Sequence, residues 1–124
     1  MPRATVSSET ERKDLKSLPD GYVVLKRMSY GQSVQRRAML RMSFETTGKK
    51  NDFRGEMAMA SEEIQRFEFA NCIVDHNLED DNGNKLALGT AQGMAQLDPK
   101  VGQEIEKYIE EMNNFEDEAE AEGN

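Results

Sequence analysis

The sequence predicts an α+β fold that is mainly α, in which three to four helices accompany a small antiparallel sheet. Several segments carry apolar residues at helical spacing, and one short segment is rich in β-branched residues. The 124 residues are 36% hydrophobic and 32% charged, which leaves room for one domain with a small core. We expect a single compact domain over residues 20–113, between a flexible arm at 1–19 and a disordered acidic tail at 114–124.

The arm and the first strand are distinguished by their apolar content. Large apolar side chains are scarce before residue 20, with Leu15 and Leu18 the main ones, so burial there would not offset the ordering entropy. The proline, aspartate and glycine at 19–21 are typical of a turn. Residues 22–27 follow with tyrosine, two valines and leucine, and this composition predicts a strand.

A helix and a second strand are expected next. Ser29 with Gln32 three residues later is a capping-box pattern, which predicts a helix from about Tyr30 to Met42. Residues 53–59 alternate apolar and polar side chains, and a period of two indicates a half-buried strand. It would pair with the strand at 22–27 or with one formed by residues 42–46.

The second half of the chain predicts three helices. Ser61 and the two glutamates after it indicate the start of a central helix that ends near Asn77. A turn is expected at 79–84, and Thr90 would cap a short helix over 91–96. Asp98 followed by a proline predicts a last helix over 99–113, with its apolar residues on one face.

No pattern of residues specifies an enzyme, a metal site or a cofactor site. If Gly83 took the sixth position of an EF-hand loop, Leu78 and Gly89 would take the first and twelfth, and neither has a carboxylate. Cys72 and His76 are four residues apart on the expected central helix, where the two side chains would be within reach. We interpret Cys72 as core and His76 as a helix C-terminal residue favoured by the dipole.

The charge is divided unevenly along the chain. Residues 1–54 hold 12 basic and 6 acidic side chains, a balance of +6, whereas residues 55–124 hold 4 and 18, a balance of −14. An isoelectric point near 4.7 and arginines without an aromatic platform argue against nucleic acid as a partner. We also expect no membrane span, no signal peptide and, from the single cysteine, a reducing compartment.

Three segments within residues 20–116 together carry a resemblance to a known family. They are residues 20–31 (DGYVVLKRMSYG), residues 69–78 (FANCIVDHNL) followed by an acidic turn with Gly83, and the segment from Leu97 to Asn113. Together they resemble the small tail assembly chaperones encoded by long-tailed bacteriophages. Members of that family bind the tape measure protein, keep its apolar helical stretches soluble and help tail tube subunits assemble around it.

The resemblance implies a non-enzymatic chaperone of the host cytoplasm that is absent from the mature virion. Its expected partners are the tape measure protein and the tail tube protein, with a homo-oligomer left open. The eight methionines would supply adaptable apolar surface, or fill gaps in a core poor in aromatic residues. As a hypothesis, the helices at 30–42 and 99–113 form a client groove lined by Met39, Met42, Ile105, Tyr108 and Met112.

Two other classes of protein stay open at this point. A structural head–tail or tail-completion component would be present in purified particles, where a chaperone is missing. An acidic decoy or regulator would bind a nucleic-acid-binding protein in a salt-sensitive way.

Overall fold

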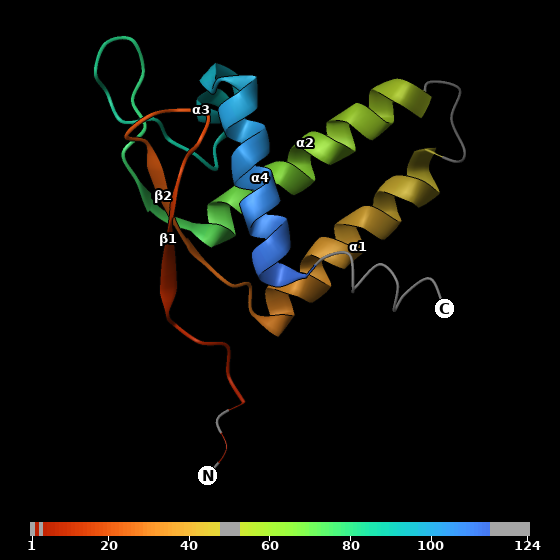
Figure 1. Ribbon diagram of the computed structural model, residues 1–124. Helices are drawn as coiled ribbons and strands as arrows, with labels where there is room; N and C mark the ends of the chain where they lie inside the picture. The colour runs from red at the N-terminus through yellow and green to blue at the C-terminus, as the bar shows by residue number, and fades with distance from the viewer. Residues whose placement is uncertain (1, 3, 48–52, 115–124) are drawn as a thin grey trace.

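The structure, a computed structural model, describes residues 2, 4–47 and 53–114, and the side chains of residues 42–61 lie outside that description (Figure 1). In the described part, a three-stranded antiparallel sheet is accompanied by four helices, which confirms the predicted fold class. The elements are β1 (Thr10–Asp14), β2 (Tyr22–Lys26), α1 (Tyr30–Thr47), α2 (Phe53–Cys72), β3 (Ile73–His76), α3 (Ala91–Gln96) and α4 (Pro99–Asn113).

The predicted strand at 22–27 is the central strand of the sheet. The strand order is β1-β2-β3, with both neighbours antiparallel to β2. Val23 and Leu25 alternate inward along β2 and are fully buried, as a half-buried strand requires. The register against β3 shifts between Val24 and Leu25, which marks a bulge or irregularity in the ladder.

Strand β1 corrects the expectation of a flexible arm over residues 1–19. Thr10 lies opposite Lys26 and Asp14 lies opposite Tyr22, and Leu15 immediately after the strand is only 5% exposed. The strand is mostly polar because it is an edge strand held by backbone hydrogen bonds to β2, which composition does not reveal. The predicted tail at 114–124 lies outside the described residues, apart from Asn114, which ends α4 in a left-handed conformation.

Helices α1 and α2 run antiparallel beside each other as a helical hairpin (Figure 1). The predicted capping box is present at the start of α1: the Gln32 amide donates to Ser29 Oγ at 3.2 Å, and the Ser29 amide donates to Gln32 Oε1 at 2.9 Å. Helix α1 continues past Met42 to Thr47. The predicted strand at 53–59 is wrong, since these residues begin α2; methionine and alanine favour a helix over a strand.

The predicted central helix from Ser61 to Asn77 is wrong at both ends. Helix α2 begins before Ser61 and ends at Cys72, and residues 73–76 form β3 instead of a last helical turn. The β-branched pair Ile73 and Val74 fits a strand, and the open edge of β2 supplies backbone partners for it.

The last two helices confirm their predictions. Thr90 Oγ1 accepts a hydrogen bond from the Gly93 amide at 3.1 Å at the start of α3. Asp98 Oδ1 accepts one from the Lys100 amide at 2.9 Å at the start of α4, where Pro99 is the first helical residue.

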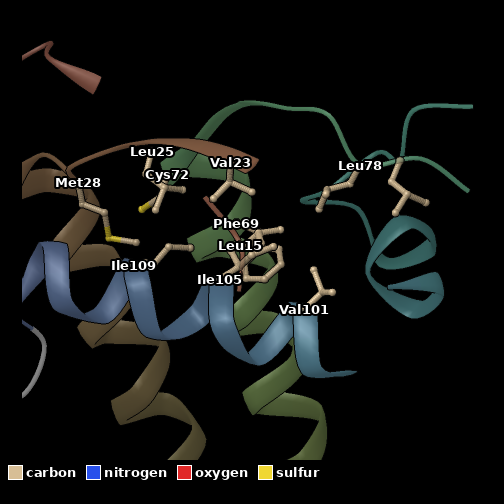
Figure 2. Close-up of a cluster of buried hydrophobic side chains, with 11 residues drawn as sticks. Leu15, Val23, Leu25, Met28, Phe69, Cys72, Leu78, Val101, Ile105 and Ile109 are labelled. Carbon is tan, nitrogen blue, oxygen red and sulfur yellow. The ribbon is translucent and has the colours of Figure 1, made fainter. Parts of the chain in front are cut away.

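The core is formed where α4 packs against β2 and α2. In Figure 2 the side chains from α4 point toward those of the strand and of α2. Leucine and methionine side chains from the connecting loops complete the cluster. Its buried members are Leu15, Val23, Leu25, Met28, Phe69, Cys72, Leu78, Leu86, Val101, Ile105 and Ile109.

We predict that Gly93→Ala destabilises the fold and that Gly31→Ala does not. Gly93 is buried in α3, and a Cβ there would overlap the carbonyl oxygen of Ala87, whereas at Gly31 the nearest atom is Ser29 Oγ at 3.9 Å. Gly93→Ala should lower the free energy of unfolding by about 1–3 kcal/mol. Gly31→Ala should leave it unchanged or raise it by up to about 1 kcal/mol. Urea unfolding followed by circular dichroism measures both, and equal stabilities would contradict the close contact.

Candidate functional site

Of the five residues predicted to line a client groove, the four whose side chains the structure describes do not share one surface. Ile105 is fully buried in the core, so its assignment to an exposed groove is wrong: its position on the α4 stripe faces β2 and α2. Tyr108 and Met112 are partly buried on α4, and Met39 is partly buried on α1, against different neighbours. The side chain of Met42 lies outside the described part of the chain.

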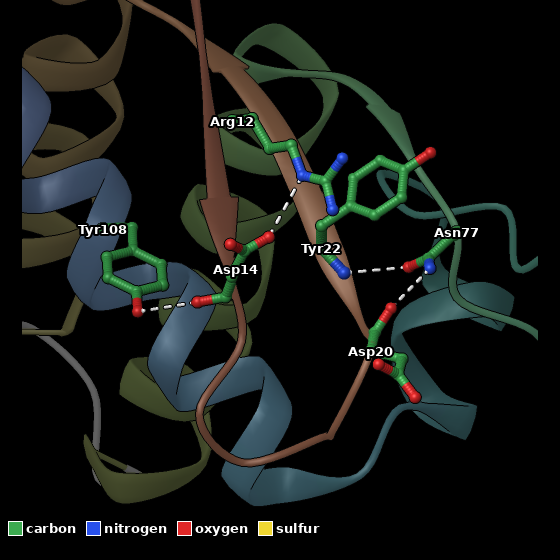
Figure 3. Close-up of polar contacts among 6 residues, drawn as sticks. All are labelled: Arg12, Asp14, Asp20, Tyr22, Asn77 and Tyr108. Atoms are coloured by element: carbon green, nitrogen blue, oxygen red, sulfur yellow. Dashed lines mark hydrogen bonds and ion pairs between the residues drawn. The ribbon is translucent and has the colours of Figure 1, made fainter.

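Tyr108 takes part in a hydrogen-bonded network that joins α4 to the N-terminal segment. Glu104, one turn earlier, accepts from the Lys16 amide at 2.8 Å, the Ser17 amide at 2.9 Å and the Ser17 hydroxyl at 2.6 Å. The Tyr108 hydroxyl lies 2.7 Å from Glu104 Oε2. It also lies 3.2 Å from the carbonyl oxygen of Asp14, the contact drawn in Figure 3. These hydrogen bonds fix the loop after β1 to α4. The Tyr108 hydroxyl therefore stabilises the fold.

This network shifts the pKa values of both side chains. Burial alone would raise the pKa of Glu104, but hydrogen bonds from Lys16, Ser17 and Tyr108 together lower it to about 2. The hydrogen bond to the Glu104 carboxylate, with burial and the charge itself, raises the pKa of Tyr108 to about 12. The tyrosine hydroxyl therefore keeps its proton and acts as a donor at neutral pH.

Two asparagines join other pairs of segments that are distant in the sequence. Asn77 accepts a hydrogen bond from the Tyr22 amide and donates one to the carbonyl oxygen of Asp20, each at 2.8 Å (Figure 3). Asn113 accepts one from the Met28 amide at 2.9 Å, where the chain passes from β2 to α1. These contacts join residues far apart in the sequence, and only the polarity of the side chains signals them beforehand.

Met39 borders a hollow of about 330 Å³, which we name the hairpin hollow. Phe67 and Ala70 of α2 add apolar surface, and Gly89 lies against Ala70 so closely that a Cβ there would be 3.0 Å from the Ala70 Cα atom. The remaining lining side chains are polar and of both charges, namely Glu63, Arg66 and Asn71.

Tyr108 and Met112 border a different hollow, of about 380 Å³, between α4 and the first two strands. Its lining is mostly charged, with Lys13 and Arg27 facing Glu11 and Glu111. No lining residue is shared with the hairpin hollow, so Met39 lies in one depression and Tyr108 and Met112 lie in another.

Glu68 on α2 is a buried carboxylic acid that sequence reasoning missed, because its helical position resembled an ordinary polar one. Arg36 Nε of α1 lies 3.6 Å from its Oε2, and Glu106 and Glu110 of α4 act on it electrostatically. Burial raises the pKa of Glu68 to about 7; Arg36 lowers it, and the two glutamates raise it further. Burial and Glu110 also raise the pKa of Glu106.

Cys72 and His76 both take part in the folded core and its backbone contacts. Cys72 is fully buried, as predicted, and burial raises the pKa of its thiol to about 11, which makes it a poor nucleophile at neutral pH. His76 is not at a helix end: it lies in β3, and its Nδ1 accepts a hydrogen bond from the Leu78 amide at 3.0 Å. Burial also lowers the pKa of His76, so the imidazole is neutral near pH 7.

In the described part of the chain, no three His, Cys, Asp or Glu side chains are grouped so as to hold a metal ion. Among its helices, none combines the length and apolar character needed to cross a membrane. Comparison of the chain with protein-family models, with curated proteins and with solved structures finds no match.

We predict that Glu104→Gln loosens the N-terminal segment. The amide has no charge, and its NH₂ group would meet the amides of Lys16 or Ser17, so the free energy of unfolding should fall by about 1–2 kcal/mol at this partly exposed site. Hydrogen exchange should become faster at those two amides first. Glu62→Gln, on the exposed side of α2, is the matched control; equal exchange in the two variants would contradict the anchoring role.

We predict that Glu68 makes the protein less stable as pH rises. Its folded pKa of about 7 lies above the usual 4.5, so its stability contribution is complete below 4.5 and is lost as pH rises through about 7. The melting temperature should therefore fall more between about pH 5 and about pH 8 in the native protein than in Glu68→Gln, which stays neutral. Glu106 and His76 titrate in both proteins, so the difference between the two curves of melting temperature against pH reports Glu68 alone. Parallel curves would contradict the raised pKa of Glu68.

Proposed function

We propose that this protein is a non-enzymatic tail assembly chaperone of a long-tailed bacteriophage, which binds the tape measure protein and assists assembly of the tail tube. The resemblance of residues 20–116 to that family supports the proposal. In this account the chaperone works in the host cytoplasm and leaves before the virion is complete. The tail tube protein would be a second partner.

The observation that carries the proposal is the hairpin hollow beside α1. Met39, Phe67 and Ala70 give it apolar surface, and Glu63 and Arg66 give it rims of both charges. An amphipathic helix binds such a place by inserting apolar side chains while its polar edges meet the rims. Methionine suits this use because its flexible, polarizable side chain accepts different shapes.

The first turns of α1 carry a second apolar patch, separate from the hairpin hollow. Tyr30 and Val34 are four residues apart and both are exposed. At about 100° per residue they lie on a different side of α1 from Met39. The Gln32 side chain donates to Asn71 Oδ1 at 3.0 Å and holds α1 against α2. A client helix would therefore meet a surface that is already formed, which lowers the entropic cost of binding.

The buried thiol of Cys72 and the neutral imidazole of His76 support a role without covalent chemistry. Both side chains are enclosed by the core or by backbone contacts, and each pKa shift disfavours the reactive form of a Cys–His pair.

Co-expression with the tape measure protein tests the proposal. The native chain should keep that protein in the soluble fraction, and Met39→Asp should reduce the soluble amount several-fold, because a carboxylate would be placed in the hairpin hollow beside Glu63. Val74→Asp, at an exposed valine of β3, is the matched control and should behave like the native chain.

Two results would overturn the proposal. The first is equal solubility of the tape measure protein with and without this chain. The second is a stoichiometric amount of this chain in purified particles, measured by mass spectrometry, which would indicate a structural component of the virion instead.

A further inference from the structure

A third depression, which we name the loop groove, lies between the loop before β2, the loop after β3 and the start of α4. Its volume is about 520 Å³. The apolar lining comes from Leu18, Leu78, Leu86, Leu97 and Val101. Leu78, Leu86 and Val101 belong to the buried core and form the floor of the groove. The apolar surface that a partner could cover comes from Leu18, which is 40% exposed, and from the half-buried Leu97.

The rim of the loop groove is acidic. Glu79, Asp80, Asp81 and Asp98 border it, and the lining includes no lysine and no arginine. Two of these carboxylates hold the walls in shape: Asp80 Oδ1 accepts from the amides of Asn82 and Asn84, each at 2.9 Å, and Asp98 caps α4. Glu79 and Asp81 are exposed.

We propose that the loop groove binds a linear segment of a partner protein in which apolar side chains are flanked by lysine or arginine. The apolar side chains would cover Leu18 and Leu97, and burial of that surface supplies the favourable free energy. The basic side chains would meet the acidic rim, which gives specificity and speeds association. A second copy of this chain fits less well, because its net charge of −8 repels the rim.

This inference goes beyond the proposed function and stands on a different surface. The loop groove shares no lining residue with the hairpin hollow, so a substitution in one site leaves the lining of the other unchanged. A failure of either proposal is therefore measured separately.

The test uses the full chain and a fluorescein-labelled peptide of leucines interspersed with lysines and arginines. Fluorescence anisotropy should show saturable binding that weakens as salt is added, and the same peptide with glutamates in place of its basic residues should not bind. Glu79→Lys combined with Asp81→Lys should weaken binding by about tenfold or more. Glu9→Lys combined with Glu62→Lys changes the net charge equally at exposed sites elsewhere and should leave binding within about twofold.

A second pair of variants tests the apolar half of the groove. Leu18→Ser removes an apolar side chain that is 40% exposed and should weaken binding by about tenfold, whereas Val6→Ser, at 45% exposure before β1, should not. The charge-reversal pair still decides the matter if Leu18→Ser fails to fold. Equal binding by all variants, or equal binding of the glutamate peptide, would overturn the proposal. So would a groove substitution that changes only the sedimentation of the protein alone, since a second copy would then be the occupant.

Discussion

Helix α4 carries the apolar stripe on which the rest of the structure depends. Val101, Ile105 and Ile109 occupy one side of it and pack against both β2 and α2, so this helix covers the junction between the sheet and the helical hairpin. Its polar residues reinforce the same contact, with Glu104 holding the loop after β1 and Asn113 holding the end of β2. A chain with so little apolar area needs this concentration of contacts, because a small core leaves little stability in reserve.

The surfaces proposed for binding are products of that arrangement. The hairpin hollow is formed where the turn at Gly89 approaches α2, and the loop groove is formed where the first turn of α4 meets two loops. The hollow has rims of both charges and the groove has an acidic rim. A chaperone with two such surfaces would hold a client helix and a basic segment at the same time, and would distinguish them by charge as well as by shape.

Local signals explain which parts of the fold could be predicted from the sequence. The bounds of α4 were predicted correctly because Asp98, a proline and a regular apolar spacing all lie within one segment. The end of α2 was not, because β3 exists only by pairing with β2, and β1 was missed for the same reason. At the candidate site, helical spacing placed Ile105 and Tyr108 on one side of α4 but did not reveal that the core covers the first and Glu104 engages the second. The sequence showed which side of each helix is apolar. It did not show which residues pack against that side, because those residues lie far away along the chain.

The anchoring of the N-terminal segment also has a consequence for the order of events during synthesis. The Lys16 amide reaches Glu104 across 88 residues, and Leu15 is buried in a core completed by Ile105 and Ile109. The first strands therefore leave the ribosome long before the helix that secures them, and the apolar side of β2 is covered only by α2 until nearly the whole domain has been translated. A protein proposed to keep the apolar helices of another chain soluble would therefore itself expose apolar surface while it is being synthesised.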